Sequence, residues 1–350
     1  MISGAEPAFT SWVKLLPMKL PAISSLAPAI LAGISLGTPA FAVINIDYAS
    51  IGDAGNAADS ATGSLYGAVA YAYQIARNET TISQYAEFLN AVAATDTYSL
   101  YSANMTNSHN NGIARSGVSG SFTYSVASGS ANKPITYVSW FDAARFTNWM
   151  HNGQLTGAQN NLTTEGGAYT LNGAVSGVSI SKNVGATVWI PSENEWYKAA
   201  YYDPNKGGVG VGGYWAQATQ SNTVAGNTVG VATSANYDDG DYVGYPGMAL
   251  TDVGAYGLNS DSAYGTNDQA GNVWEWNDAV ISGSSRGLRG GSWGYDSDSL
   301  PASYRHLLGP SVENNSIAGF RVASVPEPSA VVLTMLSVSA CPTRRRRSTL

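Results

Sequence analysis

Apolar residues recur at helical spacing in three short stretches of this 350-residue chain. In the first stretch, Ile82, Tyr85 and Leu89 follow Thr81 at intervals of three to four residues, which places them on one face of a helix. Threonine before such a run is a preferred N-cap. The pattern therefore predicts a helix over residues 81–92.

Two further helices are predicted by their first residues. Ser139 precedes an apolar stretch that predicts a helix over residues 139–150. Ser192 and Glu195 form a capping box, in which the two side chains satisfy each other's free backbone N–H groups. This box predicts a helix over residues 192–201.

The rest of the chain lacks long periodic segments. Residues 187–190 read as a short strand that ends at Pro191. Stretches rich in Gly, Ser and Asn predict hairpins and surface loops between the helices, at 102–131, 152–186 and 205–233. No internal repeat and no second domain is visible in the pattern.

The N-terminal 42 residues predict a secretory signal peptide. An apolar run over residues 20–36 follows two lysines, and the Ala-x-Ala sequence at 40–42 predicts cleavage after it. A membrane anchor is the alternative, which the prolines within the run disfavour. Translation starts at Met1 or at Met18, which precedes the second lysine.

Residues 326–350 have a tripartite order. Pro-Glu-Pro begins the segment, an apolar stretch covers 329–340, and four arginines occupy 344–347. The apolar stretch is shorter than the roughly 20 residues of a spanning helix, and arginines remain on the cytoplasmic side. The segment resembles the PEP-CTERM sorting signal of Gram-negative bacteria that make extracellular polysaccharide. The resemblance implies transient membrane association and removal by an exosortase-type protease; a frayed basic terminus is the alternative.

Charge and cysteine content limit the possible partners and chemistry of residues 43–325. Without the two ends, 11 basic and 22 acidic residues remain, a net charge of −11. This charge argues against nucleic acid and anionic membrane surfaces as partners. The single cysteine, Cys341, lies in the tail. A domain of this size buries a sufficient core without disulfides. The predicted signal peptide and sorting tail together predict an exported protein of the outer envelope, cell surface or extracellular matrix.

Four sequence blocks stand out from the polar background. They begin at Ile75 (IARNETTISQYAEFL), Pro134 (PITYVSWFDAA), Trp189 (WIPSENEWYKAA) and Asp268 (DQAGNVWEW), and the last is followed by RGGSW at 289–293 and GFRV at 319–322. In this order they resemble the formylglycine-generating enzyme family, the sulfatase-modifying factors, over residues 63–324. The resemblance implies an α+β fold of the C-type-lectin-like superfamily that is poor in regular structure and stabilised by calcium.

The DQAGNVWEW block also predicts a calcium site from its residues. Asp268 and Glu275 supply carboxylates, and Gly271 permits a tight turn between them. The family pattern adds the carbonyl groups of Gly271 and Val273. In the alternative interpretation, Glu275 is a buried acid paired with an arginine.

A second family calcium site has a weaker match. It corresponds to Asn236 and Tyr237 with Asp241 and the carbonyl group of Val243. The alternative is a solvated acidic loop over residues 238–241.

The family's reaction requires groups that this chain lacks. The resemblance implies copper(I) held by two cysteine thiolates that follow the GGSW block, and only such soft ligands select this ion. By register, Tyr295 and Leu300 occupy the two cysteine positions. Neither side chain binds copper(I), so we expect no copper and no formylglycine-generating activity.

Other catalytic chemistry has few candidates. The three histidines are scattered and form no metal-binding pair. His306 follows Arg305 and is the one candidate acid or base, with a cleft-lining role as its alternative. Asp296 and Asp298 could form a carboxylate pair, although an exposed acidic turn explains them better.

Tryptophans and arginines in the motifs predict a packed interior. We expect Trp140, Trp196, Trp274 and Trp276 in the core, whereas Trp293 corresponds to a position that lines the family's substrate groove. Arg289, Arg305 and Arg321 are expected to tie core loops together.

Three functions remain open. The leading one is a non-catalytic protein whose cleft binds a peptide or glycan, with the cleft residues Trp293, Tyr295, Asp296, Leu300, Arg305 and His306. The second is an enzyme with a different, non-thiol chemistry in this cleft, and the third is a structural matrix protein without a defined cleft. Convergent acids within reach of His306 would favour the enzyme.

Overall fold

The computed structural model describes residues 43–106, 111–240 and 250–326. The predicted signal peptide and nearly all of the predicted sorting tail lie outside these residues. Within the described ranges, no helix combines the length and the apolar character needed to cross a membrane.

The three predicted helices are confirmed. They are α1 (Ile82–Val92), α2 (Trp140–His151) and α3 (Glu193–Tyr201), preceded by Thr81, Ser139 and Ser192 as N-caps. Each cap forms a capping box with the residue three positions on, so backbone N–H groups at each helix start are satisfied locally. The helices therefore begin where the sequence places their caps.

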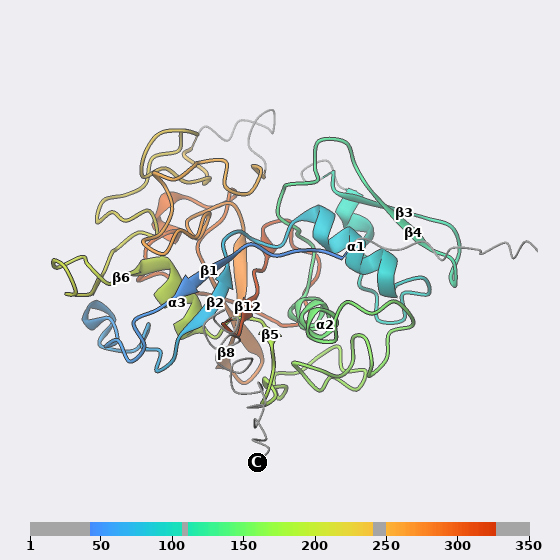
Figure 1. Ribbon diagram of the computed structural model, residues 1–350. Coiled ribbons are helices and arrows are strands. Elements are labelled where there is room, and N and C mark those ends of the chain that lie inside the picture. The colour runs from blue at the N-terminus through green and yellow to red at the C-terminus, as the bar shows by residue number, and fades with distance from the viewer. Residues whose placement is uncertain (1–42, 107–110, 241–249, 327–350) are drawn as a thin grey trace, which may run out of the picture. The chain divides into compact units, whose positions relative to one another are not determined.

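A four-stranded antiparallel sheet joins distant parts of the chain. Its order is β1 (Tyr48–Ile51), β2 (Tyr73–Ala76), β12 (Ala323–Ser324) and β5 (Val188–Trp189). The last strand along the chain therefore lies inside the sheet. In Figure 1, α1 and α2 lie to the right of this sheet and α3 lies to its left.

The second four-stranded sheet brings the most specific sequence blocks together. Its order is β10 (His306–Leu308), β9 (Ser285–Arg289), β8 (Trp274–Ser282) and β11 (Ala318–Gly319). β8 and β9 form an antiparallel hairpin, whereas β11 runs parallel to β8. The GNVWEW, RGGSW and GFRV blocks consequently meet around the start of β8.

The remaining regular elements are short. They are two hairpins, β3 (Ile113–Ser116) with β4 (Thr123–Val126) and β6 (Tyr202–Asp203) with β7 (Gly213–Tyr214), and three 3-10 turns at Ser60–Thr62, Ala103–Thr106 and Ser297–Ser299. With three α-helices and short, mixed sheets in its described residues, the domain is α+β as predicted. The polar stretches are hairpins and loops, also as predicted.

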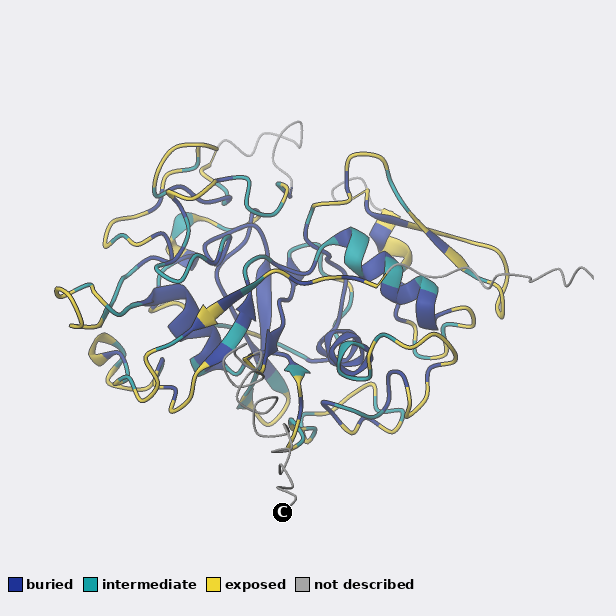
Figure 2. Cartoon of the chain, in the orientation of Figure 1, coloured by how far each residue is buried: buried dark blue, intermediate teal, exposed yellow. Residues whose placement is uncertain are grey.

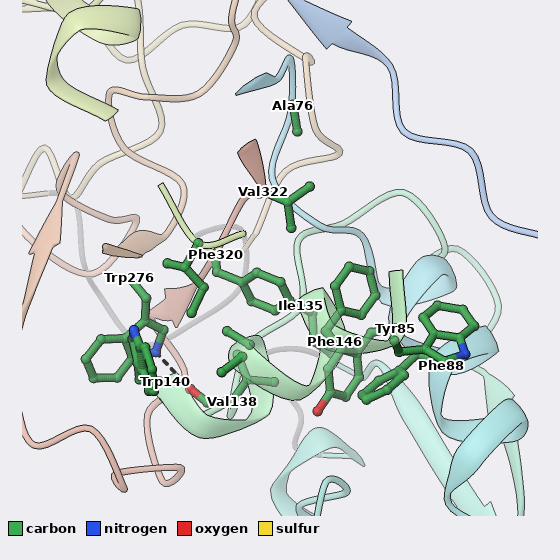
Figure 3. Packing of buried hydrophobic residues seen from close by; sticks show 14 of the residues in the cluster. Ala76, Tyr85, Phe88, Ile135, Val138, Trp140, Phe146, Trp276, Phe320 and Val322 are labelled. Carbon is green, nitrogen blue, oxygen red and sulfur yellow. Dashed lines mark hydrogen bonds between the residues drawn. The ribbon is translucent and has the colours of Figure 1, made fainter. Parts of the chain in front are cut away.

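Aromatic side chains fill the core on both sides of α2. Phe146 packs edge-on against Phe88 and Phe320, with ring centroids 5.4 and 5.3 Å apart (Figure 3). At the other end of the cluster, the indole N–H of Trp276 donates a 3.1 Å hydrogen bond to the Val138 carbonyl group. Nearly the whole of α2 is buried (Figure 2).

The predicted core tryptophans are confirmed. Trp140, Trp196, Trp274 and Trp276 are each at most 1% exposed. A tryptophan that is surrounded by other side chains loses packing and apolar burial together when it is shortened. These residues are therefore elements of the fold rather than a binding surface.

The capping acid of α2 makes stability depend on pH. Burial, with the Glu313 carboxylate nearby, raises the pKa of Asp142 to about 8. Between about pH 4, where an unfolded aspartate titrates, and about pH 8, the folded state binds an extra proton, so the free energy of unfolding falls as pH rises. We expect Asp142→Asn to weaken this fall between pH 5 and 8 in urea titrations. An unchanged pH dependence would assign the titration to other groups.

Candidate functional site

Four aromatic rings from three segments of the chain lie together at the start of β8. Trp274 is 1% exposed, and its ring lies 5.5 Å from that of Tyr295, 5.7 Å from that of Tyr304 and 5.1 Å from that of His306. The last three side chains are partly exposed or exposed. We call Tyr295, Tyr304 and His306, which cover Trp274, the aromatic surface.

The two copper-ligand positions have different surroundings. Tyr295 stands edge-on to Trp274 in the aromatic surface. Leu300 is fully buried in an apolar cluster with Trp196 and Tyr201, and its carbonyl group accepts a 3.2 Å hydrogen bond from the Tyr201 hydroxyl. Packing thus replaces the thiolate pair at these positions, and neither residue supplies a ligand for copper(I).

Two predicted cleft residues are corrected by the structure. Trp293 is only 4% exposed and packs against Leu250 and Val273, so its placement in a groove is wrong. Its backbone N–H donates to the Asn272 carbonyl group at 2.9 Å, which draws this segment inward against the GNVWEW block. Leu300 likewise belongs to the core and lines no cleft.

His306 has no acidic partner in the described part of the chain. Partial burial lowers the pKa of its imidazole, which favours the neutral ring at neutral pH. The ring contacts Trp274 and Tyr295. Asp296 and Asp298 are exposed, and among the described residues neither side chain forms a hydrogen bond with His306. The arrangement favours a ring surface over an acid–base pair.

Arg305 forms an ion pair with Glu193, a carboxylate that was not predicted from the sequence. Glu193, at the start of α3, pairs with Arg305 and also with Arg289, whose Nε donates at 2.8 Å. Arg289 additionally donates to the carbonyl groups of Ala302 and Tyr304. This network fixes the chain just before β10, so Arg305 positions the aromatic surface from behind.

Glu275 is held by a buried ion pair. Arg321 donates from Nε to Oε2 at 2.6 Å and from Nη2 to Oε1 at 2.7 Å, and Trp196 Nε1 also donates to Oε2 at 2.8 Å. Both charged side chains are completely buried. The described residues thus show Glu275 in its alternative role, as a buried acid between tryptophans that is paired with an arginine.

A second buried acid lies next to this pair and was not singled out in the sequence. Burial, together with the neighbouring Asp268 carboxylate, raises the pKa of Glu79 well above its ordinary range. Glu79 accepts a 3.2 Å hydrogen bond from Asn272 Nδ2, and Asp268 accepts one from the backbone N–H of Gly254 at 2.5 Å. The Ile75 block contains Glu79 beside Arg77, but nothing in that spacing indicates burial.

One predicted calcium ligand, the Glu275 carboxylate, is engaged by a buried ion pair in this structure. Arg321 donates to both oxygens of Glu275, so a calcium ion at this position would share the carboxylate with the guanidinium group. Within the described ranges, no group of three or more His, Cys, Asp or Glu side chains could hold a metal. Calcium at this position stays a prediction. Melting in EDTA tests it: destabilisation that calcium reverses supports the site, and an unchanged midpoint supports the ion pair alone.

The second predicted calcium site is only half described. Asp241 and Val243 lie outside the described residues. Asn236 donates from Nδ2 to Asn272 Oδ1 at 3.1 Å, and the carbonyl oxygen of Tyr237 accepts from Asn227. This site stays a prediction.

The fold and the motif geometry define the class of protein: an α+β domain whose GNVWEW, RGGSW and GFRV blocks form one centre. Its sequence matches the Sulfatase-modifying factor enzyme 1-like domain over residues 57–325. The chain belongs to this family. A search of curated proteins finds no match.

Solved structures with a similar fold have low sequence identity. The crystal structure of CarF is 20% identical with a TM-score of 0.47, covering 81% of this chain and 100% of that chain. Treponema denticola variable protein 1 is 19% identical with a TM-score of 0.48, covering 82% and 97%. PvdO from Pseudomonas aeruginosa is 18% identical with a TM-score of 0.41, covering 73% and 82%.

Proposed function

We propose that this chain is an exported, non-catalytic member of its family that binds a peptide or a glycan on the aromatic surface. The observation that carries the proposal is the environment of the two copper-ligand positions. Tyr295 packs against Trp274, and Leu300 is sealed in the core. The chain retains the family's domain, whereas the two cysteine thiolates that would hold copper(I) are absent from these positions.

The aromatic surface has the character of a recognition surface. Tyrosine and histidine present apolar faces together with polar edges, a combination that suits both sugar rings and extended peptides. The Arg289–Glu193–Arg305 network holds the backbone at Tyr304, just before His306, so little backbone ordering is needed there on binding. Rigid support of this kind favours binding.

Export and sorting complete the proposal. Residues 1–42 would direct secretion, and an exosortase-type protease would remove residues 326–350, which leaves the protein at the envelope, cell surface or matrix. The C-type-lectin-like superfamily would explain how a fold with little regular structure carries a grafted binding surface. Detecting the mature N-terminus and the trimmed C-terminus by mass spectrometry of secreted protein tests both steps.

An enzyme with another chemistry is the second candidate. It would use His306, whose neutral ring can accept a proton, but Asp296 and Asp298 are exposed, and among the described residues neither forms a hydrogen bond with this ring. Incubating the domain with copper(I), oxygen and a cysteine-containing peptide tests the family reaction directly. We expect the cysteine to remain unconverted, and a formylglycine product would contradict the proposal.

Tyr304→Ala should weaken ligand binding about tenfold or more, because it removes a ring that is 36% exposed and lies against Trp274. Tryptophan fluorescence measures the effect in titrations with chitohexaose and with extended hexapeptides, since Trp274 lies beneath the surface. Tyr71→Ala is the control, as its ring is 48% exposed elsewhere. Equal effects of both substitutions, or none from Tyr304→Ala, would contradict binding at this surface.

A further inference from the structure

A polar groove lies away from the aromatic surface, along the loop that follows α1. Three cavities of about 450, 390 and 500 Å³ adjoin one another there. The first and third share Tyr98 and Gly173, the first and second share Gln159, and the second and third share Thr97. We call this continuous depression, lined from residues 90–99, 156–165, 172–175 and 311–313, the Tyr98 groove.

The lining of the Tyr98 groove is rich in amides and hydroxyls and contains no lysine or arginine. Asn160, Asn161 and Asn172 contribute exposed carboxamides. Glu165 also lines the groove, but Arg145 neutralises it through hydrogen bonds of 2.7 and 3.0 Å. Carboxamides both donate and accept, which matches hydroxyl groups better than phosphate or carboxylate.

Tyr98 supplies the aromatic face of the groove. The guanidinium group of Arg145 lies 4.3 Å from the centre of its ring, which fixes the ring by a cation–π contact. Tyr98 lines two of the three cavities. A fixed, partly exposed tyrosine among carboxamides can stack against a sugar ring while the amides bind its hydroxyls.

Gln159 fixes the backbone of Tyr98 beside the groove. The residue is 8% exposed, and its Oε1 accepts a 2.9 Å hydrogen bond from the backbone N–H of Tyr98. Its Nε2 is buried and lies near the Asp96 carboxylate, so Gln159 holds the Tyr98 segment in place and is not exposed to a ligand.

We propose that the Tyr98 groove binds an unbranched, uncharged oligosaccharide. Two carboxylates, Glu165 and Glu313, face the groove without a lining cation to balance Glu313, which disfavours an anionic ligand. The combined volume of the three adjoining cavities suits several sugar units rather than one. The groove shares no residue with the aromatic surface, so the two proposals can fail independently.

Isothermal titration of the whole secreted domain tests this inference with neutral hexasaccharides: cellohexaose, laminarihexaose and maltohexaose. Hexagalacturonate is the charged control, and a Gly-Ser-rich hexapeptide represents peptides. We expect at least one neutral hexasaccharide to bind, and Asn161→Ala, an exposed substitution, and Tyr98→Ala each to weaken it about tenfold. Tyr98→Phe keeps the stacking ring and should retain most of the affinity.

The outcomes separate the two surfaces. Loss of binding in the groove variants with full binding by Tyr304→Ala supports the Tyr98 groove. Binding that only Tyr304→Ala removes overturns it and assigns the glycan to the aromatic surface. Absence of any neutral hexasaccharide binding at millimolar concentration, or preference for hexagalacturonate or the peptide, also overturns it. Melting curves of Asn161→Ala and Tyr98→Ala distinguish lost contacts from lost folding.

Discussion

Replacing Arg321 by methionine should lower the free energy of unfolding by about 3–5 kcal/mol, because it leaves the charge of Glu275 buried without its partner. All five guanidinium N–H groups are used in this structure. Besides Glu275, they reach the carbonyl groups of Ala76, Arg77 and Asn267 at 2.8–3.0 Å. One side chain thus joins β2, the DQAGNVWEW block and the last motif. Urea unfolding of the domain over residues 43–325 measures the loss.

An exposed ion pair gives the matched control for Arg321. Asp47 lies 3.4 Å from Arg77, with side chains 76% and 38% exposed, so Asp47→Ala should cost less than about 1 kcal/mol. Adding Glu275→Leu to Arg321→Met should recover part of the loss, because the unpaired buried charge is then gone. A cost near that of the Asp47 control, or no recovery in the double variant, would show that this ion pair contributes little.

Gly271→Ala should cost about 2–5 kcal/mol, since it combines backbone strain with a steric clash. Gly271 has a φ of +83°, in the left-handed region that glycine adopts without penalty. An added Cβ would lie 2.1 Å from the carbonyl oxygen of Asn236, a backbone atom that cannot rotate away. The two segments are bridged there by the hydrogen bond from Asn272 N–H to Asn236. Urea unfolding again measures the effect.

Gly55→Ala is the control that distinguishes backbone strain from the steric clash. Its φ is also +83°, but nothing lies within 4 Å of an added Cβ, so Gly55→Ala should cost only about 1 kcal/mol. The difference between the two alanine variants then measures the close approach of Asn236. Equal costs would mean that the segments separate readily, which would contradict a rigid centre at the GNVWEW block.

Local signals in the sequence were sufficient for the helices. Thr81, Ser139 and Ser192 mark the three starts, because a cap is satisfied by residues within one turn and needs no distant contact. The short strands were a harder case. β12 contains two residues and gains its place between β2 and β5 only from partners that are far away in the sequence.

The candidate site was foreseen only in part. Tyr295 and His306 were expected together, and their rings do lie 5.9 Å apart over Trp274. Trp293 was placed in the groove because it corresponds to a position that lines the family's substrate groove. Its burial depends on neighbours from other segments, which the sequence does not show. Tyr304 was not predicted at the site, because its contact with Trp274 also joins segments that are distant in the sequence.

By itself, the sequence determined the family, the three helix starts and the absence of cysteine from residues 43–325, because each depends on residue identity and near neighbours. Only the tertiary structure decided that Glu275 pairs with Arg321, that Leu300 is buried in the core and that four segments line the Tyr98 groove. These features need residues distant in sequence to meet with a particular geometry. The loss of copper ligands was therefore readable from two positions, whereas the surfaces that remain for binding required the folded chain.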